Sequence, residues 1–352
     1  MSGFMMSPGE ENNLETLKPD IQTRIGYIDF LKFVGLTAII LAHVGSPGWV
    51  MMLRSFDVPL MVILSSVLAE KSYRKYECRG IGALKDYYIS RIRRLVIPTW
   101  GFLTLYFGVC ILKGQHQSIR YYIESYCLTR YGMGYVWIIL IYLYSALLIP
   151  LFSRMKLSRK EGGRVIVAAV YCVYEVVYCL QIGIENKFLD TTLFYIVPYG
   201  MLTYLGYHFC RMNKKTKKTI AIMAFCVFLM FGIYYWITTG EFQSVQIAKY
   251  PPRLYYLGYG IAWSFFLLIF FEKRTFKFYD NPFIKYISVH SLGIYLCHIL
   301  MLTIYSDLGL PEIWLVKFLV VFLVTVIVVF GGNKLLDFIK NRISLYKSFK
   351  MQ

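Results

Sequence analysis

The sequence predicts an all-α membrane protein, a polytopic helix bundle with about ten transmembrane helices. Three observations support this fold class. Of the 352 residues, 57% are hydrophobic and 18% are aromatic, whereas soluble chains average about 45–50% apolar residues. The apolar residues gather in runs of roughly 20, which is the length that crosses a bilayer. The basic residues behind the formal charge of +18 lie mostly in short segments between these runs.

Each apolar run is long enough to form one spanning helix. The fifth run carries the acidic residue Glu175, and the sixth begins with Asp190. The expected spans are 28–46, 49–69, 95–112, 134–153, 165–182, 190–210, 218–238, 253–271, 286–305 and 313–336.

The distribution of basic residues predicts the orientation. With ten spans and a cytoplasmic N-terminus, 29 Lys and Arg residues fall on the cytoplasmic side and 8 on the outer side. Cytoplasmic segments of membrane proteins are enriched in these residues, so both termini are expected to be cytoplasmic. Residues 1–24 form a polar tail, 25–338 the transmembrane domain and 339–352 a basic tail. The first 22 residues lack the features of a signal peptide, so the first helix is expected to be a retained insertion signal.

Several functional classes have no support in the sequence. Nucleic-acid binding is not expected, because the positive charge follows the topology and no soluble domain is present to contact bases. The eight cysteines form no CxxC pair, and they indicate neither a metal site nor a disulfide framework. The chain also lacks a GxSxG elbow, a Walker loop and an HExxH motif, so hydrolase and metalloprotease chemistry is not predicted.

Lys32 and His43 are the most informative residues. Eleven residues at about 100° each bring the two side chains within roughly 20° of one helical face, about 16 Å apart. Charged and ionisable side chains within a lipid-spanning helix face protein or water. A neutral imidazole can accept a proton from a hydroxyl, so His43 is the candidate catalytic residue. The alternative is a histidine that only packs within the bundle.

Two arginines stand where a cytoplasmic loop enters the third span. Arg91 and Arg94 are three positions apart and share a helical face. Two guanidinium groups in this position can bind a phosphate or pyrophosphate. The alternative is that they only anchor the helix at the membrane surface.

Further candidates lie on later spans. Asp57 could orient His43 or form an ion pair with Arg54. His298 is at a depth similar to that of His43, and a packing role is its alternative. Arg253 and Tyr256 begin the eighth span on the outer side, where aromatic residues suit either a sugar ring or the aromatic belt of the membrane interface.

Four ordered motifs resemble the acyltransferase-3 family of polytopic bacterial O-acyltransferases. The segment Tyr27–Lys32 followed by His43 resembles the first helix of that family, and Phe56–Leu68 resembles the second. The pair Arg91 and Arg94 before Pro98 resembles its R-x-x-R motif, and Ser291–His298 resembles its S-x-x-I-Y-L-x-H motif. The chain departs from the family pattern at Lys32, where many members have arginine, and at LSSVL in the second helix.

The resemblance implies transfer of an acyl group, usually acetyl from acetyl-CoA, to a hydroxyl of a cell-surface glycan or lipid-linked sugar. It implies acetyl-CoA as co-substrate, no metal, and a location in the bacterial cytoplasmic (inner) membrane. Direct transfer and an acetyl-histidine intermediate both remain open, as do a glycan or anion transporter and a non-catalytic scaffold. The expected roles are catalysis by His43 and Asp57, donor binding by Lys32, Arg91 and Arg94, and acceptor binding or support by Asp29, Arg253, Tyr256 and His298.

Overall fold

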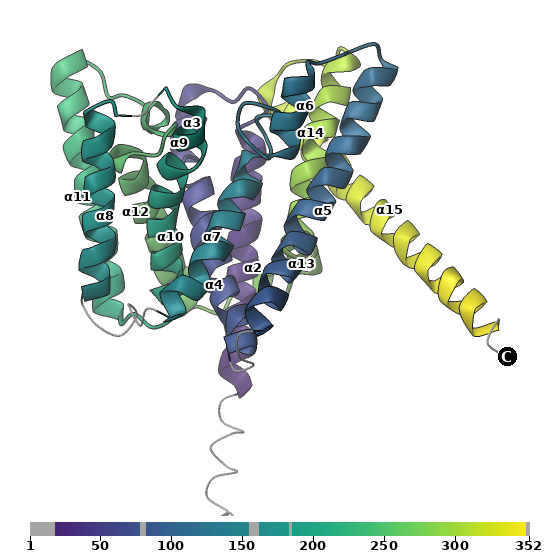
Figure 1. Cartoon of the computed structure of the whole chain (residues 1–352), viewed down its shortest axis with the longest axis horizontal. Coiled ribbons are helices and arrows are strands. Elements are labelled where there is room, and N and C mark those ends of the chain that lie inside the picture. Colours follow the sequence, from purple (N-terminus) through teal and green to yellow (C-terminus); the bar gives the residue numbers. More distant parts are fainter. Residues whose placement is uncertain (1–17, 78–81, 155–161, 183–184, 350–352) are drawn as a thin grey trace, which may run out of the picture.

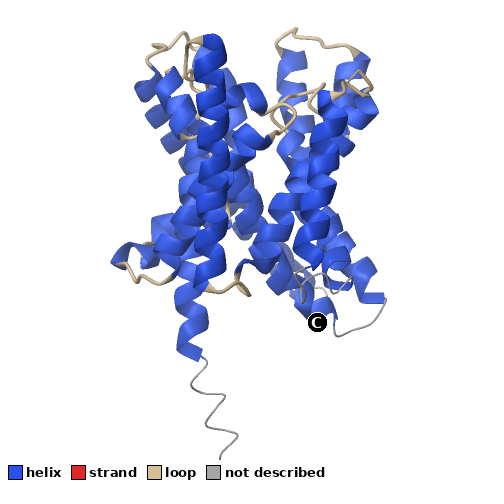
Figure 2. Ribbon diagram, turned by 90° about the vertical axis from the view of Figure 1, so that its left-hand side faces the viewer, coloured by secondary structure: helices blue, strands red, loops and turns tan. Residues whose placement is uncertain are grey.

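The computed structural model is built from helices and connecting loops (Figures 1 and 2). It describes residues 18–77, 82–154, 162–182 and 185–349. The long helices in this part of the chain are α2 (Lys18–Leu41), α4 (Asp57–Glu77), α5 (Gly82–Leu112), α7 (Trp137–Arg154), α8 (Gly162–Cys179), α10 (Leu193–Phe209), α11 (Lys214–Thr239), α12 (Leu254–Glu272), α14 (Ser291–Asp307) and α15 (Trp314–Phe349). The short ones are α3 (Gly48–Leu53), α6 (Ile119–Tyr126), α9 (Lys187–Thr191), η1 (Val245–Ala248), η2 (Lys277–Asp280) and α13 (Pro282–Val289).

The long helices run alternately up and down between two ends of a bundle. Helices α3, α6 and α9 lie at the end that Figure 1 shows at the top, called the upper end below. The described chain begins with α2 and finishes with α15 toward the opposite, lower end. Helices α2 and α4 lie near the centre, and α15 leaves the bundle at an angle. The helices nearest the centre therefore determine which side chains face one another.

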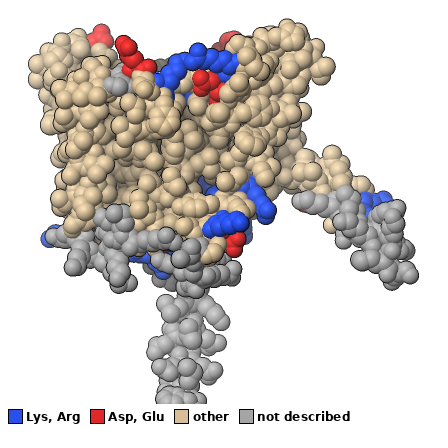
Figure 3. Space-filling view, in the orientation of Figure 1, with Lys and Arg blue, Asp and Glu red and all other residues tan. Residues whose placement is uncertain are grey.

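Each of the ten expected apolar runs is mostly helical in this structure. By length and hydropathy alone, five helices of the described chain qualify as membrane spans, or six if the bent pair α13–α14 is one span. Helices α7 and α8 are apolar but shorter. The membrane character of the bundle is thus evident, and the expected count of ten is higher than the number that length and hydropathy support. The visible face carries a broad uncharged band between charged groups at its two ends (Figure 3).

The ninth expected span is broken rather than continuous. Helices α13 and α14 meet at an angle of 82° around His290. Tertiary hydrogen bonds hold this break, since the Ser288 carbonyl accepts from Lys32 Nζ at 2.5 Å and Asn333 Nδ2 lies 3.1 Å from His290 Nδ1. The Ser288 hydroxyl also donates to Asp29 at 2.6 Å. The break brings the end of α13 and the start of α14 against α2.

Local sequence explains where several helices begin and how closely they pack. Asn213 and Asn281 cap α11 and α13 through their side-chain oxygens, as expected for short polar residues before a helix. At Gly206 in α10, a Cβ atom would lie 2.5 Å from the Ile63 carbonyl oxygen. The glycine therefore permits α10 to approach the backbone of α4 closely. This contact fixes α4, which supplies one wall of the site described next.

Candidate active site

Two histidines from distant parts of the chain meet inside the bundle. His43 Nδ1, in the turn after α2, lies 3.0 Å from His298 Nε2 on α14. The rings are stacked, with centroids 5.2 Å apart and planes 19° apart. His298 is fully buried, whereas His43 is half-buried. The Tyr135 ring packs edge-on against His43 at 4.9 Å.

The hydrogen bonds around the pair assign the positions of its protons. His298 Nδ1 contacts the Tyr295 carbonyl oxygen, which can only accept, so Nδ1 carries the hydrogen. In neutral His298, Nε2 is then an acceptor, and His43 Nδ1 must be the donor. His43 Nε2 is left with a free lone pair. The arrangement of a base held by a second group is the one that activates hydroxyl nucleophiles in enzymes.

A cavity of about 330 Å³ lies inside the bundle. It is lined by side chains from α2, α4, α5, α7 and α14. Its volume lies within the range of about 300–1,000 Å³ that is usual for small-molecule sites. Ile39 and Tyr295 line the cavity, and each stands about one helical turn from a histidine of the pair. The cavity wall therefore includes residues one helical turn from each histidine, while the two histidines themselves are not among the residues that line it.

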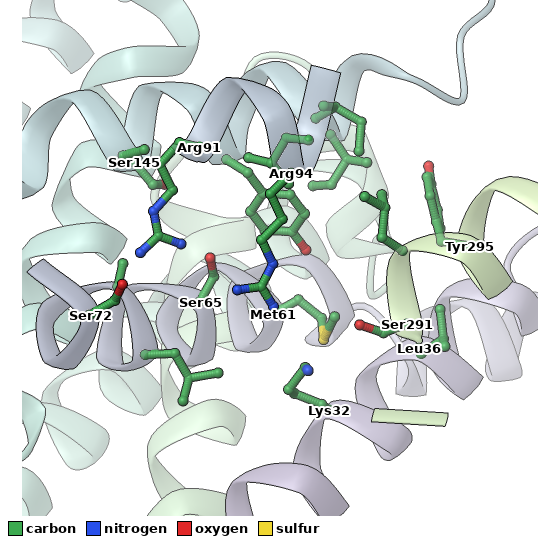
Figure 4. A pocket seen from close by; sticks show the side chains of 18 of the residues that line it. Lys32, Leu36, Met61, Ser65, Ser72, Arg91, Arg94, Ser145, Ser291 and Tyr295 are labelled. Carbon is green, nitrogen blue, oxygen red and sulfur yellow. The ribbon is translucent and has the colours of Figure 1, made fainter. Parts of the chain in front are cut away.

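Three basic residues line the same cavity. Lys32, Arg91 and Arg94 direct their charged groups into the space between α5 and the pair α2 and α4 (Figure 4). The Arg91 guanidinium lies 5.1 Å from the centre of the Tyr87 ring, and its Nη2 atom is buried without a hydrogen-bond partner. A buried, unpartnered guanidinium nitrogen is costly, and an anionic ligand would relieve this cost. The lining also offers the hydroxyls of Ser65, Ser72, Ser145 and Ser291.

The broken helix contributes two features to the cavity wall. The Ser288 carbonyl at the end of α13 holds Lys32 in place. Ser291 and Leu292, the first residues of α14, line the cavity. Backbone N–H groups at a helix start favour anions, and this start lies opposite the arginines of α5. The cavity is therefore built to accept a ligand with negative charge.

Arg93 faces a different space from its neighbours. It lines an open depression with Asp86, Ile89, Ser90 and Arg94, and it does not line the inner cavity. Only Arg94 borders both spaces. The separation of Arg93 from Arg91 follows from their positions around the helix, and it makes Arg93 a natural control.

Asp57 forms the local ion pair that the sequence left open. Its Oδ2 atom lies 2.5 Å from Arg54 Nη1, and its Oδ1 atom accepts from the Val58 N–H at 2.7 Å. The hydrogen-bond partner of His43 is His298 instead. Lys249 is buried near this ion pair, and both Arg54 and Lys249 exert their positive charges on His43. Burial lowers the pKa of Lys249 to about 8, against the opposing influence of Asp57.

The other predicted residues are spread over the molecule. Asp29 supports Ser288, about 21 Å along α2 from His43 by helical rise. Arg253 contacts α8, where its Nε lies 3.1 Å from Glu175 Oε2. Tyr256 is fully buried, and its hydroxyl has no hydrogen-bond partner. The residues that were predicted to bind or support the acceptor substrate therefore do not form one group.

Several residues in and around the site could not be predicted from the sequence. Ser65, Ser72 and Ser145 are ordinary small residues within apolar helices, and no spacing rule distinguishes them. Lys249 is one of 8 basic residues counted toward the outer side, so its burial has no signature in the sequence.

A comparison with protein families gives one clear result. The profile of the acyltransferase-3 family, described as an acyltransferase domain, matches residues 25–333. No curated relative and no solved structure matches the chain. Among the described residues, no three His, Cys, Asp or Glu side chains gather as a metal site. The matched region includes the histidine pair and the whole cavity, and the chain is a membrane protein of the acyltransferase-3 family.

Proposed function

We propose that the protein transfers an acetyl group from acetyl-CoA to a hydroxyl of a cell-surface glycan or lipid-linked sugar. The observation that carries this proposal is the cavity, which gathers Lys32, Arg91 and Arg94 and whose wall includes Ile39 and Tyr295, each about one helical turn from a histidine of the His43–His298 pair. Such a cavity suits a donor with a charged, phosphate-bearing end and a reactive thioester end. The family membership supports acyl transfer in general.

The basic residues suit the phosphates of the donor. Arg91 and Arg94 lie on one side of the cavity and Lys32 on the other (Figure 4). Guanidinium groups bind phosphate through paired hydrogen bonds, whereas lysine contributes a point charge. The pantetheine arm would then follow the apolar stretch lined by Leu36, Ile39 and Ile139 and bring the thioester close to His43.

The chemistry needs one base and no further reactant. His43 Nε2 accepts the proton of the acceptor hydroxyl while that oxygen bonds to the acetyl carbon. The carbon–sulfur bond breaks, and the leaving thiolate takes the proton back from the imidazolium. His298 Nε2 accepts from His43 Nδ1 throughout and stabilises the imidazolium form. In the second route, Nε2 attacks the thioester carbon and the CoA thiolate leaves. The acceptor oxygen then bonds to the acetyl carbon, the bond from that carbon to Nε2 breaks, and the hydroxyl proton passes to the thiolate.

The charge distribution supports entry of the donor from the cytoplasm. Most of the 29 Lys and Arg residues assigned to the cytoplasmic side lie in segments of the sequence that join helices at the lower end, as expected for cytoplasmic segments. The cavity residues Arg91 and Arg94 belong to that end of α5. The acceptor would approach from the upper end, where Tyr135 and Tyr250 are partly exposed.

Purified protein in lipid nanodiscs provides a direct test. With acetyl-labelled acetyl-CoA and a glycan extract, we expect release of free CoA and transfer of label to the glycan. The two products should form in equal amounts. Movement of glycan or anion across a vesicle membrane without CoA release would instead identify a transporter, and it would contradict the proposal.

A further inference from the structure

The loop that precedes α12 places an unpaired cation near His43. Lys249 follows η1 and is only 6% exposed. The loop is held against the junction of α3 and α4, since Gln246 Nε2 donates to Ser55 Oγ at 2.5 Å. Helix α12 is held at the same junction, where Tyr259 Oη donates to the Leu53 carbonyl at 2.9 Å. These contacts position Lys249 beside the Arg54–Asp57 ion pair.

The charges in this group do not balance. Arg54 and Asp57 are 5% and 1% exposed, and both oxygens of the Asp57 carboxylate already have partners. Lys249 Nζ lies 5.2 Å from the centre of the Tyr250 ring. Among the described residues, none accepts a hydrogen bond from its ammonium group. Two cations therefore share one carboxylate, and an uncompensated buried charge is costly unless a ligand pairs with it.

Unsatisfied hydrogen-bonding groups surround the same place. Arg54 Nε and the hydroxyls of Tyr195, Tyr199 and Tyr256 are buried without partners. The rings of Tyr195 and Tyr199 pack on Trp137 at 5.7 and 6.1 Å, and that of Tyr250 at 5.4 Å. Native proteins seldom leave several buried polar atoms unpaired in one region. Aromatic faces with free hydroxyls suit a polyhydroxylated ring.

We infer that the acceptor is an anionic glycan, whose carboxylate or phosphate pairs with Lys249 while its reacting hydroxyl lies at His43. The inference rests on the proposed function and names its substrate class. Lys249 lies against the Tyr250 ring, which packs on Trp137 at 5.4 Å, and Trp137 is two residues from Tyr135, whose ring packs against His43 at 4.9 Å. A sugar that is held at Lys249 therefore presents its hydroxyls toward the base. The donor cavity has its own basic residues, and Lys249 is not among the residues that line it.

Matched small acceptors test the inference. Methyl glucoside, methyl glucuronide and methyl glucoside 6-phosphate differ mainly in their charge, and the last two distinguish a carboxylate from a phosphate. We expect kcat/KM of the wild-type protein to be higher for at least one charged compound than for the neutral one, by about ten- to a hundred-fold. Lys249→Met should abolish the preference by raising KM for the charged acceptor, and Lys249→Arg should largely retain it.

The control variant is Lys317→Met. Lys317 is 9% exposed, but it is paired with Glu312 at 2.6 Å, so this variant removes a buried lysine without altering the proposed subsite. It should keep the preference. Changes in tryptophan fluorescence measure the binding of each acceptor to each variant, so they give the same comparison without turnover.

Two results would overturn the inference. One is a wild-type protein that binds and uses neutral and charged acceptors equally well. The other is a Lys249→Met variant that slows both acceptors equally, which would assign the ammonium to the transition-state oxyanion. In either case, His43-dependent acetylation of the neutral acceptor would leave the proposed function standing.

Discussion

His43 Nδ1 and His298 Nε2 lie 3.0 Å apart, although 255 residues separate them in the chain. Because the Tyr295 carbonyl fixes the hydrogen on His298 Nδ1, this contact leaves His43 Nε2 as the free basic atom. The pair thus resembles the general arrangement in which one group holds a catalytic base in its reactive tautomer. His298 is a positioning residue in this account.

Replacement of His298 should therefore reduce kcat more than it changes KM for acetyl-CoA. We expect His298→Ala to lower kcat at least about tenfold, since loss of a general base's function is worth 10²–10⁴-fold in total. His298→Gln should recover part of the loss, because its amide oxygen can accept from His43 Nδ1. Steady-state kinetics at matched protein levels measure both constants. Equal activities of the two variants would contradict the positioning role.

Arg91 and Arg94 should contribute more to acetyl-CoA binding than Arg93. Arg91→Ala and Arg94→Ala should each weaken acetyl-CoA binding by about ten- to a hundred-fold, the value of a charge-assisted hydrogen bond of roughly 1.5–3 kcal/mol. Arg→Lys should restore binding only in part, because lysine lacks the paired donors. Arg93→Ala is the matched control, as this residue lies outside the inner cavity. Identical affinities for all three alanine variants would remove these arginines from the donor site.

The orientation of the bundle can be tested with single cysteines. In a cysteine-free background, Gln115→Cys in the exposed loop after α5 should react with an impermeant thiol reagent in intact cells. Asp86→Cys, on the exposed lower part of α5, should react only after the cells are opened. The basis is the excess of Lys and Arg at the lower end. Labelling of position 86 in intact cells would place the donor cavity on the outer side.

The preference for charged acceptors should depend on pH. Burial lowers the pKa of Lys249 to about 8, so its ammonium is charged below that pH and loses its proton as the pH rises through it. The neighbouring groups are Arg54, Asp57, Tyr250 and His43. The ratio of kcat/KM for methyl glucuronide over methyl glucoside should therefore fall between pH 7 and pH 9. Because His43 acts on both acceptors, its own protonation changes both kcat/KM values alike and cancels in the ratio. A constant ratio would exclude Lys249 as the recognition group.

Much of the fold follows from local patterns. Apolar runs of spanning length fall on helices throughout the described chain, because burial in lipid requires both apolar side chains and internally bonded backbone. The break between α13 and α14 could not be foreseen, since it depends on contacts of Ser288 and His290 with residues 32 and 333. No proline or glycine lies between Tyr286 and Leu292, and tertiary hydrogen bonds hold the break.

The candidate site was partly visible in the sequence. The sequence predicts that Lys32, Arg91 and Arg94 bind the donor together, and these three residues line one cavity. Their roles in donor binding stay predictions. The partner of His43 was less evident, because Asp57 and His298 were both available and helix packing decides between them. The burial of Lys249 depends on how its loop docks on Ser55, which no periodicity encodes.

The rate of acetyl transfer by His43→Ala tests most directly whether His43 is the catalytic residue. The control is His116→Ala, at an exposed histidine in the upper loop between α5 and α6. Both variants are compared with the wild-type protein in nanodiscs, with acetyl-CoA binding and helical content as checks of folding. We predict that His43→Ala binds acetyl-CoA but transfers acetyl at least about 100-fold more slowly, while His116→Ala retains wild-type activity. Wild-type rates of transfer by the His43→Ala variant would contradict the account.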